Sequence, residues 1–343
     1  MKTHQPRYAA AASAVAIAAI VVTGCSAPPP PLVVVDAEVP EAEVLRAEVN
    51  HGEVMAHLEA FQRIADDNGG NRAAGTSGYE ASARYVEEQL RAAGYKTERQ
   101  EFSYEGRRDR EVDTFNILAD SRGDPEHTIV LGAHLDSVRR GPGINDNASG
   151  VAAVLETAVR LAESGIVPAN RVRFAFWGGE EDDLVGSQYY VDELSSDERR
   201  QTALNLNLDM VASPNAVRFV HDGDGSDLGS AGPHGSDEIE RVFMDYFRAN
   251  SLEAEPTLLF DDSDYFPFME AGIPVGGLFT GDEGTKSSSE ASVFGGTAGR
   301  QYDSCYHQAC DTVANVDVQV LEEMTDAIAH VTMSFAMAKP AAS

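Results

Sequence analysis

Residues 128–136 read Thr-Ile-Val-Leu-Gly-Ala-His-Leu-Asp, an apolar run that ends in His134 and Asp136. A short, continuous apolar run is typical of a strand that is buried on both faces of a sheet. Further runs of this kind occur at 115–118, 172–177 and 204–208. The sequence therefore predicts a central sheet in which one buried strand delivers a histidine and a carboxylate at its end.

Amphipathic segments lie before, between and after these runs. Ser77 and Glu80 have the spacing of a capping box, which predicts a helix that begins there and ends at Gly94. Apolar residues recur at helical spacing within 79–90, 151–161, 239–247 and 320–335. Strands that alternate with such helices form a sheet covered on both faces. We therefore expect an α/β fold, a single αβα sandwich with a mixed, mostly parallel central sheet.

The composition limits the classes of partner. The chain has 343 residues, of which 43% are hydrophobic, so it can build a large core. Its formal net charge is −30, from 56 acidic and 26 basic side chains. A surface this acidic repels phosphate backbones, so we expect no nucleic-acid partner and read the charge mainly as a source of solubility.

The first 25 residues have the pattern of a targeting segment. Lys2 and Arg7 precede an apolar run from 8 to 22, which is shorter than the roughly 20 residues of a membrane-spanning helix. The run ends at Val-Thr-Gly-Cys, which resembles the lipobox of bacterial lipoproteins and predicts that Cys25 is lipidated. The alternative is an ordinary signal peptide cut nearby, with Cys25 discarded. Both predict export, either to the outer face of the cytoplasmic membrane as a lipoprotein or into the medium.

Residues 26–48 are expected to tether the domain to its anchor. A polyproline stretch at 28–31 is followed by a segment rich in Val and Glu. We expect one folded domain over residues 49–340, with the lipid anchor as its membrane contact.

The chain has three cysteines. If Cys25 carries lipid, Cys305 and Cys310 remain as a pair, which export predicts to be oxidised. The alternative is a zinc site that uses both thiolates with His307.

Side chains that can bind a metal follow the predicted strands and glycine-rich segments. They are His134, Asp146, Glu181, Asp209 and His307. Each has an ordinary structural explanation when taken alone, such as a turn or a helix start. Together, two histidines and three carboxylates suit two zinc ions, each held by a histidine and a carboxylate, with the remaining carboxylate between them.

Two further acids are placed to assist without binding metal. Asp136 projects to the same side as His134, and a metal-bound imidazole usually donates its other N–H to a carboxylate. Glu180 and Glu181 form a pair directly after a buried strand. Such a pair can divide its work, with one glutamate binding metal and the other moving protons.

The stretches 133–136, 143–147, 179–181, 209–210 and 305–307 resemble the successive motifs of metallopeptidase family 28, in particular its secreted bacterial zinc aminopeptidases. The resemblance covers the chain from about Val49 to the C-terminal helix and implies a zinc-peptidase fold. It implies that His134 and Asp209 hold one zinc ion, that Glu181 and His307 hold the other, and that Asp146 bridges the two.

The resemblance also implies a mechanism. Glu180 would be the general base, Asp136 would orient His134, and Tyr306 would steady the oxyanion. The chain would remove N-terminal residues, preferably large and apolar ones, from peptides. Separately, we expect it to be a monomer.

The resemblance implies two further features. Phe279 would line the substrate pocket, and Asp264 would lie in the loop that shapes it, where Asp262 departs from a basic residue in relatives. Glu48, Glu322 and Asp326 fall where certain relatives bind a structural calcium, although a solvated acidic face explains them better.

Other functions remain open at this point. A carboxypeptidase, a deacylase or a glutaminyl cyclase can use the same fold, but the cyclases keep one zinc and a carboxypeptidase needs a cation for the substrate carboxylate. A binding lipoprotein without catalysis would be expected to lack a ligand or the base.

Overall fold

The computed structural model describes residues 32–34, 39–106 and 110–340. The predicted signal peptide, with Cys25, and the polyproline stretch lie outside the described residues. Within the described part, no helix is both long and apolar enough to cross a membrane.

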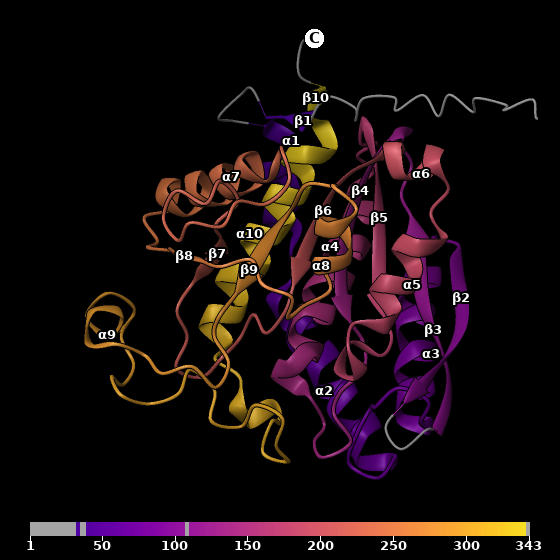
Figure 1. Cartoon of the computed structure of the whole chain (residues 1–343), viewed down its shortest axis with the longest axis vertical. Coiled ribbons are helices and arrows are strands. Elements are labelled where there is room, and N and C mark those ends of the chain that lie inside the picture. The colour runs from indigo at the N-terminus through magenta and orange to yellow at the C-terminus, as the bar shows by residue number, and fades with distance from the viewer. Residues whose placement is uncertain (1–31, 35–38, 107–109, 341–343) are drawn as a thin grey trace, which may run out of the picture.

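A mixed eight-stranded sheet runs through the molecule in the order β2-β3-β5-β4-β6-β9-β7-β8 (Figure 1). Its central strands β5, β4, β6 and β9 are parallel, whereas β3 and β7 join them antiparallel at the two sides. The predicted mostly parallel sheet is thus confirmed. The strands are β2 (Thr97–Gly106), β3 (Arg110–Asp120), β4 (Asp124–His134), β5 (Asn170–Trp177), β6 (Thr202–Leu208), β7 (Phe219–His221), β8 (Glu255–Thr257) and β9 (Val275–Phe279).

Helices cover both faces of the sheet, because the central strands are apolar on both sides. In β4, Ile129 and Leu131 join the larger core cluster, while Val130 joins a second cluster on the other face. The helices of the larger cluster are α1 (Pro40–Glu48), α2 (His51–Asp67), α3 (Ser77–Ala92), α4 (Gly150–Ser164), α7 (Ser236–Ala249) and α10 (Val318–Met337). The second cluster includes α5 (Val185–Glu193) and α8 (Phe266–Glu270), and the remaining helices are α6 (Ser196–Gln201) and α9 (Ser288–Phe294). The αβα sandwich is therefore confirmed.

Helix α3 begins one residue away from the predicted cap. Thr76 has an extended backbone, and its hydroxyl accepts a hydrogen bond from the amide of Tyr79. Thr76 is therefore the N-cap, and the predicted capping box of Ser77 and Glu80 is wrong. Glu80 instead binds Arg99 at 2.9 Å.

Regular structure occurs earlier in the chain than expected. Residues 40–48, which we assigned to the tether, form helix α1, in which Ala42 and Leu45 are fully buried and pack against α10. Further upstream, β1 (Leu32–Val33) pairs with β10 (Lys339–Pro340) near the top of Figure 1. The acidic composition of this segment hid the apolar spacing that places one helix face in the core.

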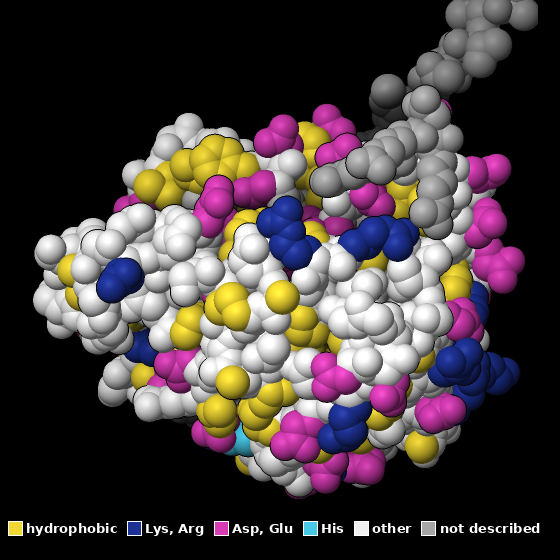
Figure 2. All heavy atoms as spheres, turned by 90° about the horizontal axis from the view of Figure 1, so that it is seen from below, with side chains coloured by type: hydrophobic (Ala, Val, Ile, Leu, Met, Phe, Trp, Pro, Cys, Tyr) yellow, Lys and Arg dark blue, Asp and Glu magenta, His cyan; other side chains and the backbone are white. Residues whose placement is uncertain are grey.

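Figure 2 shows the molecule from below. Acidic side chains are spread over this face, and basic side chains lie between them. On this face the negative charge is therefore distributed rather than gathered into one patch.

Candidate metal centre

Three adjacent parallel strands bring acids and a histidine to one edge of the sheet. His134 is the last residue of β4, and Asp209 directly follows β6. Glu180 and Glu181 follow β5 in the short helix η2 (Glu180–Asp182). Because the carboxyl ends of parallel strands meet at one edge, these side chains lie close together.

Two side chains reach this edge from loops. Asp146 lies in η1 (Ile144–Ser149), which precedes α4, and all residues of η1 are buried. His307 lies in the loop closed by Cys305 and Cys310. All five predicted ligands are thus brought to the same end of the sheet.

The ligands form two groups that share Asp146. The Nε2 atom of His134 lies 3.2 Å from Oδ1 of Asp146 and 3.3 Å from Oδ1 of Asp209. The Nε2 atom of His307 lies 3.2 Å from Oδ2 of Asp146 and 3.0 Å from Oε2 of Glu181. Each carboxylate oxygen of Asp146 therefore faces a different histidine.

The donor set fits zinc. Nitrogen and oxygen atoms bound to one tetrahedral zinc ion at about 2.0–2.1 Å are themselves roughly 3.3 Å apart, close to the separations found here. Among the described residues, the buried Oδ2 of Asp146 and Oε1 of Glu181 accept no hydrogen bond. A buried carboxylate oxygen that accepts no hydrogen bond is costly, and a bound cation would remove that cost.

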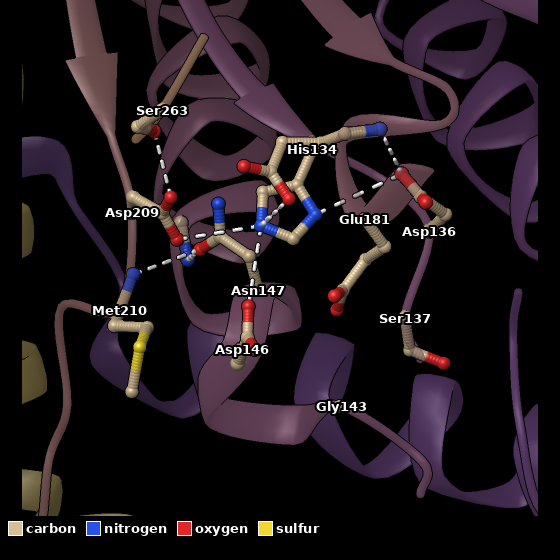
Figure 3. A network of polar contacts seen from close by, with 12 residues as sticks. His134, Asp136, Ser137, Gly143, Asp146, Asn147, Glu181, Asp209, Met210 and Ser263 are labelled. Carbon is tan, nitrogen blue, oxygen red and sulfur yellow. Dashed lines mark hydrogen bonds and ion pairs between the residues drawn. The ribbon is translucent and has the colours of Figure 1, made fainter. Parts of the chain in front are cut away.

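The imidazole of His134 lies between Asp136 on one side and Asp146 and Asp209 on the other (Figure 3). Its Nδ1 atom is 3.7 Å from Oδ1 of Asp136, which is longer than a hydrogen bond. The same oxygen accepts the amide of Gly179 at 2.9 Å and that of Glu180 at 3.3 Å. Asp136 thus connects the end of β4 with the turn that carries Glu180.

Mutual interactions shift the pKa values at this site. Burial alone would lower the pKa of His134, but the nearby Glu180 and Asp209 raise it well above the ordinary value. Burial raises the pKa of Glu180 well above that of a free glutamate, and it raises the pKa of Glu181 to about 7. So many carboxylates in a buried space favour a bound cation.

Glu180 stands apart from both ligand groups. Its Oε2 atom is 3.9 Å from Nε2 of His134, and its side chain lines the cavity beside the centre. It is therefore free to exchange protons with a molecule in that cavity.

The loop that carries Asp146 is held by residues that sequence reasoning missed. The carboxylate of Asp311 accepts the amides of Asn145 at 2.8 Å and Asp146 at 3.0 Å. Arg72 is fully buried and donates to the carbonyls of Pro142 at 2.9 Å and Gly143 at 2.6 Å, and also to that of Leu135. The sequence around Arg72 gives no local signal of this role.

The Asp209 side of the centre is held in a similar way. The side chain of Asn147 accepts the amide of Met210 at 3.2 Å and donates to the carbonyl of Leu208 at 2.8 Å. The hydroxyl of Ser263 donates to Oδ2 of Asp209 at 2.7 Å. These bonds, drawn in part in Figure 3, fix the end of β6 against the Asp146 loop.

Cys305 and Cys310 form a disulfide, with their Cα atoms 5.2 Å apart. The alternative zinc site with two thiolates does not form. Within the closed loop His307 has a φ of +56°, a conformation that is unfavourable for a residue with a Cβ. The ring of Tyr306 stacks on His307 at 3.8 Å between centroids, and the loop holds both rings beside the cavity.

A cavity of about 420 Å³ lies beside the two ligand groups. Its apolar lining includes Met210, Leu258, Phe260 and the predicted Phe279. Its acidic lining beyond the centre comprises Asp183, Asp261, Asp262 and Asp282.

Asp264 does not line this cavity, so its predicted place in the substrate pocket is wrong. Its side chain is only 1% exposed, and burial raises its pKa to about 7. Asp262 and Ser263 line the cavity instead, because the loop turns the Asp264 side chain inward.

Two of the three acids considered for calcium, Glu322 and Asp326, face basic side chains. Oδ1 of Asp326 lies 2.8 Å from Nε2 of His51, and its Oδ2 lies 3.5 Å from Arg46. Glu322 also faces His51, at 3.8 Å. Among the described residues, these acids do not form a cluster suited to a metal.

The sequence is similar to those of several named proteins. "Aminopeptidase" of Pseudomonas aeruginosa (strain UCBPP-PA14) is 50% identical over 224 residues, which cover 65% of this chain and 41% of that protein. "Leupeptin-inactivating enzyme 1" of Streptomyces exfoliatus is 42% identical over 289 residues, which cover 84% of this chain and 62% of that protein. "Probable lipoprotein aminopeptidase LpqL" of Mycobacterium tuberculosis is 50% identical over 208 residues, which cover 59% of this chain and 41% of that protein. The chain thus matches about two to three fifths of the length of these relatives.

Solved structures share the fold. An aminopeptidase from Aneurinibacillus sp. strain AM-1 superposes with a TM-score of 0.68 at 17% identity, covering 87% of this chain and 96% of the other. The zinc aminopeptidase BSAP of Bacillus subtilis superposes with a TM-score of 0.67 at 16% identity, covering 83% of this chain and 94% of the other. The family described as "Peptidase family M28" matches residues 116–332, which include every residue of both ligand groups. The chain therefore belongs to peptidase family M28.

Proposed function

We propose that this protein is an exported aminopeptidase that uses two zinc ions to remove N-terminal residues from peptides. The observation that carries the proposal is the pair of ligand groups that share Asp146 beside an acidic cavity. His134 and Asp209 would hold one ion, Glu181 and His307 the other, and Asp146 would bridge them. When bound, zinc supplies Lewis acidity, which polarises a peptide carbonyl and lowers the pKa of water.

Glu180 is the proton carrier of the proposal. It lines the cavity and belongs to neither ligand group, so its carboxylate is free to take a proton from the attacking water. The same carboxylate would then pass that proton to the amine that leaves. Asp136 positions this residue, because its carboxylate accepts the amide of Glu180.

Tyr306 would donate a hydrogen bond to the oxyanion. It lines the cavity and is held beside His307 by ring stacking. A donor fixed in this way typically contributes a few kcal/mol to the stability of the transition state.

The cavity supports an aminopeptidase over a carboxypeptidase. Among the described residues its lining contains carboxylates and no Lys or Arg. A free α-amino group is attracted to such a lining, whereas a free carboxylate is repelled. Phe279, Phe260 and Leu258 offer an apolar surface for the first side chain, which supports a preference for large apolar residues.

Export and lipid anchoring remain part of the proposal. The lipobox-like stretch before Cys25 supports both, and one relative is itself named as a lipoprotein aminopeptidase. We propose that the anchored chain acts as a monomer.

The proposal is tested with leucine p-nitroanilide and its N-acetylated form. We expect cleavage of the free amine alone, with loss of activity on chelation and recovery on addition of zinc. Cleavage of the acetylated form at an equal rate would overturn the exopeptidase assignment. Cleavage of neither substrate by protein that retains two zinc ions would favour a deacylase or a carboxypeptidase.

A further inference from the structure

A second acidic cluster lies in the loop between β7 and α7. The loop begins Asp222-Gly223-Asp224-Gly225-Ser226-Asp227. Strand β9 is parallel to β6, whereas β7 is antiparallel to β9. The carboxyl end of β7, and with it Asp222, therefore points away from the sheet edge that carries the zinc ligands.

Three carboxylates meet at this loop. Asp222 and Asp224 come from the loop and Glu240 comes from α7, and one oxygen of each lies within 4.8 Å of the others. Each carboxylate also accepts a hydrogen bond from a loop amide. Leu228 donates to Asp222 at 2.7 Å, Ser226 to Asp224 at 2.6 Å, and Gly223 to Glu240 at 2.9 Å. The loop thus folds around the three side chains.

Asp222 has an oxygen without a partner. Its side chain is fully buried, and Oδ1 takes part in no hydrogen bond among the described residues. None of the three acids forms an ion pair in the described part of the chain, because Arg241 beside Glu240 is bound to Glu238 and Asp245. A buried carboxylate that has an unpartnered oxygen and lies beside two further carboxylates is costly unless a cation joins them.

The glycines let the loop close around this point. A Cβ at Gly223 would come 2.1 Å from the carbonyl oxygen of Ser236, and Gly225 has a φ of +68°. The backbone can therefore approach the three carboxylates closely, and loop carbonyls can supply further oxygen ligands.

We propose that Asp222, Asp224 and Glu240 bind a calcium ion. The donors are all oxygens, which calcium prefers and for which zinc competes poorly. Calcium takes 6–8 oxygens at about 2.3–2.6 Å, so two of its ligands can be roughly 5 Å apart, as the cluster allows. A flexible loop suits calcium better than magnesium, which requires a near-ideal octahedron.

The bound ion would fasten the β7–α7 connection. Helix α7 packs on β9, and β9 ends at Phe279 in the cavity. Calcium would therefore stabilise the folded chain from the end of the sheet opposite the zinc ligands.

The test measures calcium binding and melting temperature on the zinc-loaded full chain. We expect equilibrium dialysis with radioactive calcium to give one saturable site with a Kd of about 0.1–1 mM. Saturation should raise Tm by roughly 5 °C. Asp224→Asn, at an exposed position, and Glu240→Gln should each weaken binding at least tenfold and remove the Tm shift.

Asp227→Asn is the matched control, because it removes a charge from the same loop but not from the cluster. It should retain both binding and the Tm shift. Absence of saturable binding would overturn the site, as would binding that survives in Asp224→Asn and Glu240→Gln. Calcium binding that is lost only in Asp326→Asn would show that the ion binds at α10, and this result would also overturn the proposed site.

Discussion

The acidic clusters around Asp146 and Asp222 lie at opposite ends of one sheet and differ in their donors. The cluster around Asp146 combines three carboxylates with two histidines, and its loop is buried and held by Arg72 and Asp311. The cluster around Asp222 contains only carboxylates and lies in a loop with an exposed member, Asp224. Imidazole and a rigid frame select zinc, whereas oxygen donors in an adaptable loop select calcium.

A third group of acids needs no metal. Glu80 and Glu87 bind the guanidinium of Arg99, which also lies over the ring of Phe115. Arginine thus neutralises this third group, whereas the clusters around Asp146 and Asp222 have the donors proposed for zinc and for calcium.

The largest expected effect lies at the zinc cluster and separates chemistry from metal binding. Glu180→Gln should lower kcat by about 10³–10⁴-fold, because the variant cannot carry the proton. Zinc content should stay unchanged, since Glu180 belongs to neither ligand group. The exposed Glu193→Gln is the control. Near wild-type turnover of Glu180→Gln on leucine p-nitroanilide would remove the residue from the base role.

A smaller effect is expected from Asp311, whose hydrogen bonds hold the loop that carries Asp146. Asp311→Asn leaves one acceptor oxygen for two backbone amides, so the Asp146 loop should loosen. Changes of this kind typically weaken metal affinity by about 10–100-fold. Competition with a zinc chelator measures the change, and Asp245→Asn on the surface serves as the control. Unchanged zinc affinity would show that the loop holds Asp146 without Asp311.

The closed loop at His307 should matter for one zinc ion more than for the other. Replacing both Cys305 and Cys310 by Ser should lower the free energy of unfolding by about 2 kcal/mol, as the chain-entropy estimate gives for so short a loop. The left-handed His307 would then relax, and the ion shared with Glu181 should dissociate first. Stepwise zinc release checks this prediction, and loss of both ions in a single step would contradict it.

The smallest effect concerns the cluster that arginine neutralises. Burial alone would raise the pKa of Glu87, but its hydrogen bond to Arg99 lowers that pKa below the ordinary 4.5. The resulting stability is present above about pH 4.5 and is lost as the pH falls through the lower, folded pKa. Glu87→Gln should therefore cost about 1 kcal/mol at pH 7 and less near pH 3.5. Urea unfolding at both pH values measures it, and an equal cost at both would contradict the ion pair.

The five residues of the cluster around Asp146 could be picked out from the sequence because their signals are local. Each ligand lies at a strand end or in a glycine-rich or cysteine-bounded stretch, and the buried strands show as apolar runs. Helix α1 was missed because Ala42 and Leu45 are the only fully buried residues of a mainly acidic segment. Strand β2 was missed because it lies at the edge of the sheet and carries mostly polar residues.

The supporting residues could not be predicted in this way. These residues, Arg72, Asp311 and Asn147, form hydrogen bonds with backbone groups that are far away in the sequence or at the end of another strand. Arginine, aspartate and asparagine are also common on protein surfaces, so their presence alone gives no signal. Asp264 was misplaced because the direction of a loop side chain depends on the turn around it. The Asp222 cluster was not predicted, since Glu240 joins it only through the packing of α7.

Counting zinc and calcium in one preparation is the most direct test of the difference between the clusters around Asp146 and Asp222. The zinc-loaded full chain would be dialysed against calcium and analysed by inductively coupled plasma mass spectrometry, together with Asp146→Ala and Asp224→Asn. We predict two zinc ions and one calcium ion per wild-type chain, loss of zinc alone in Asp146→Ala, and loss of calcium alone in Asp224→Asn. A single zinc ion in the wild type, or loss of both metals in either variant, would contradict two separate sites with Asp146 shared between zinc ions.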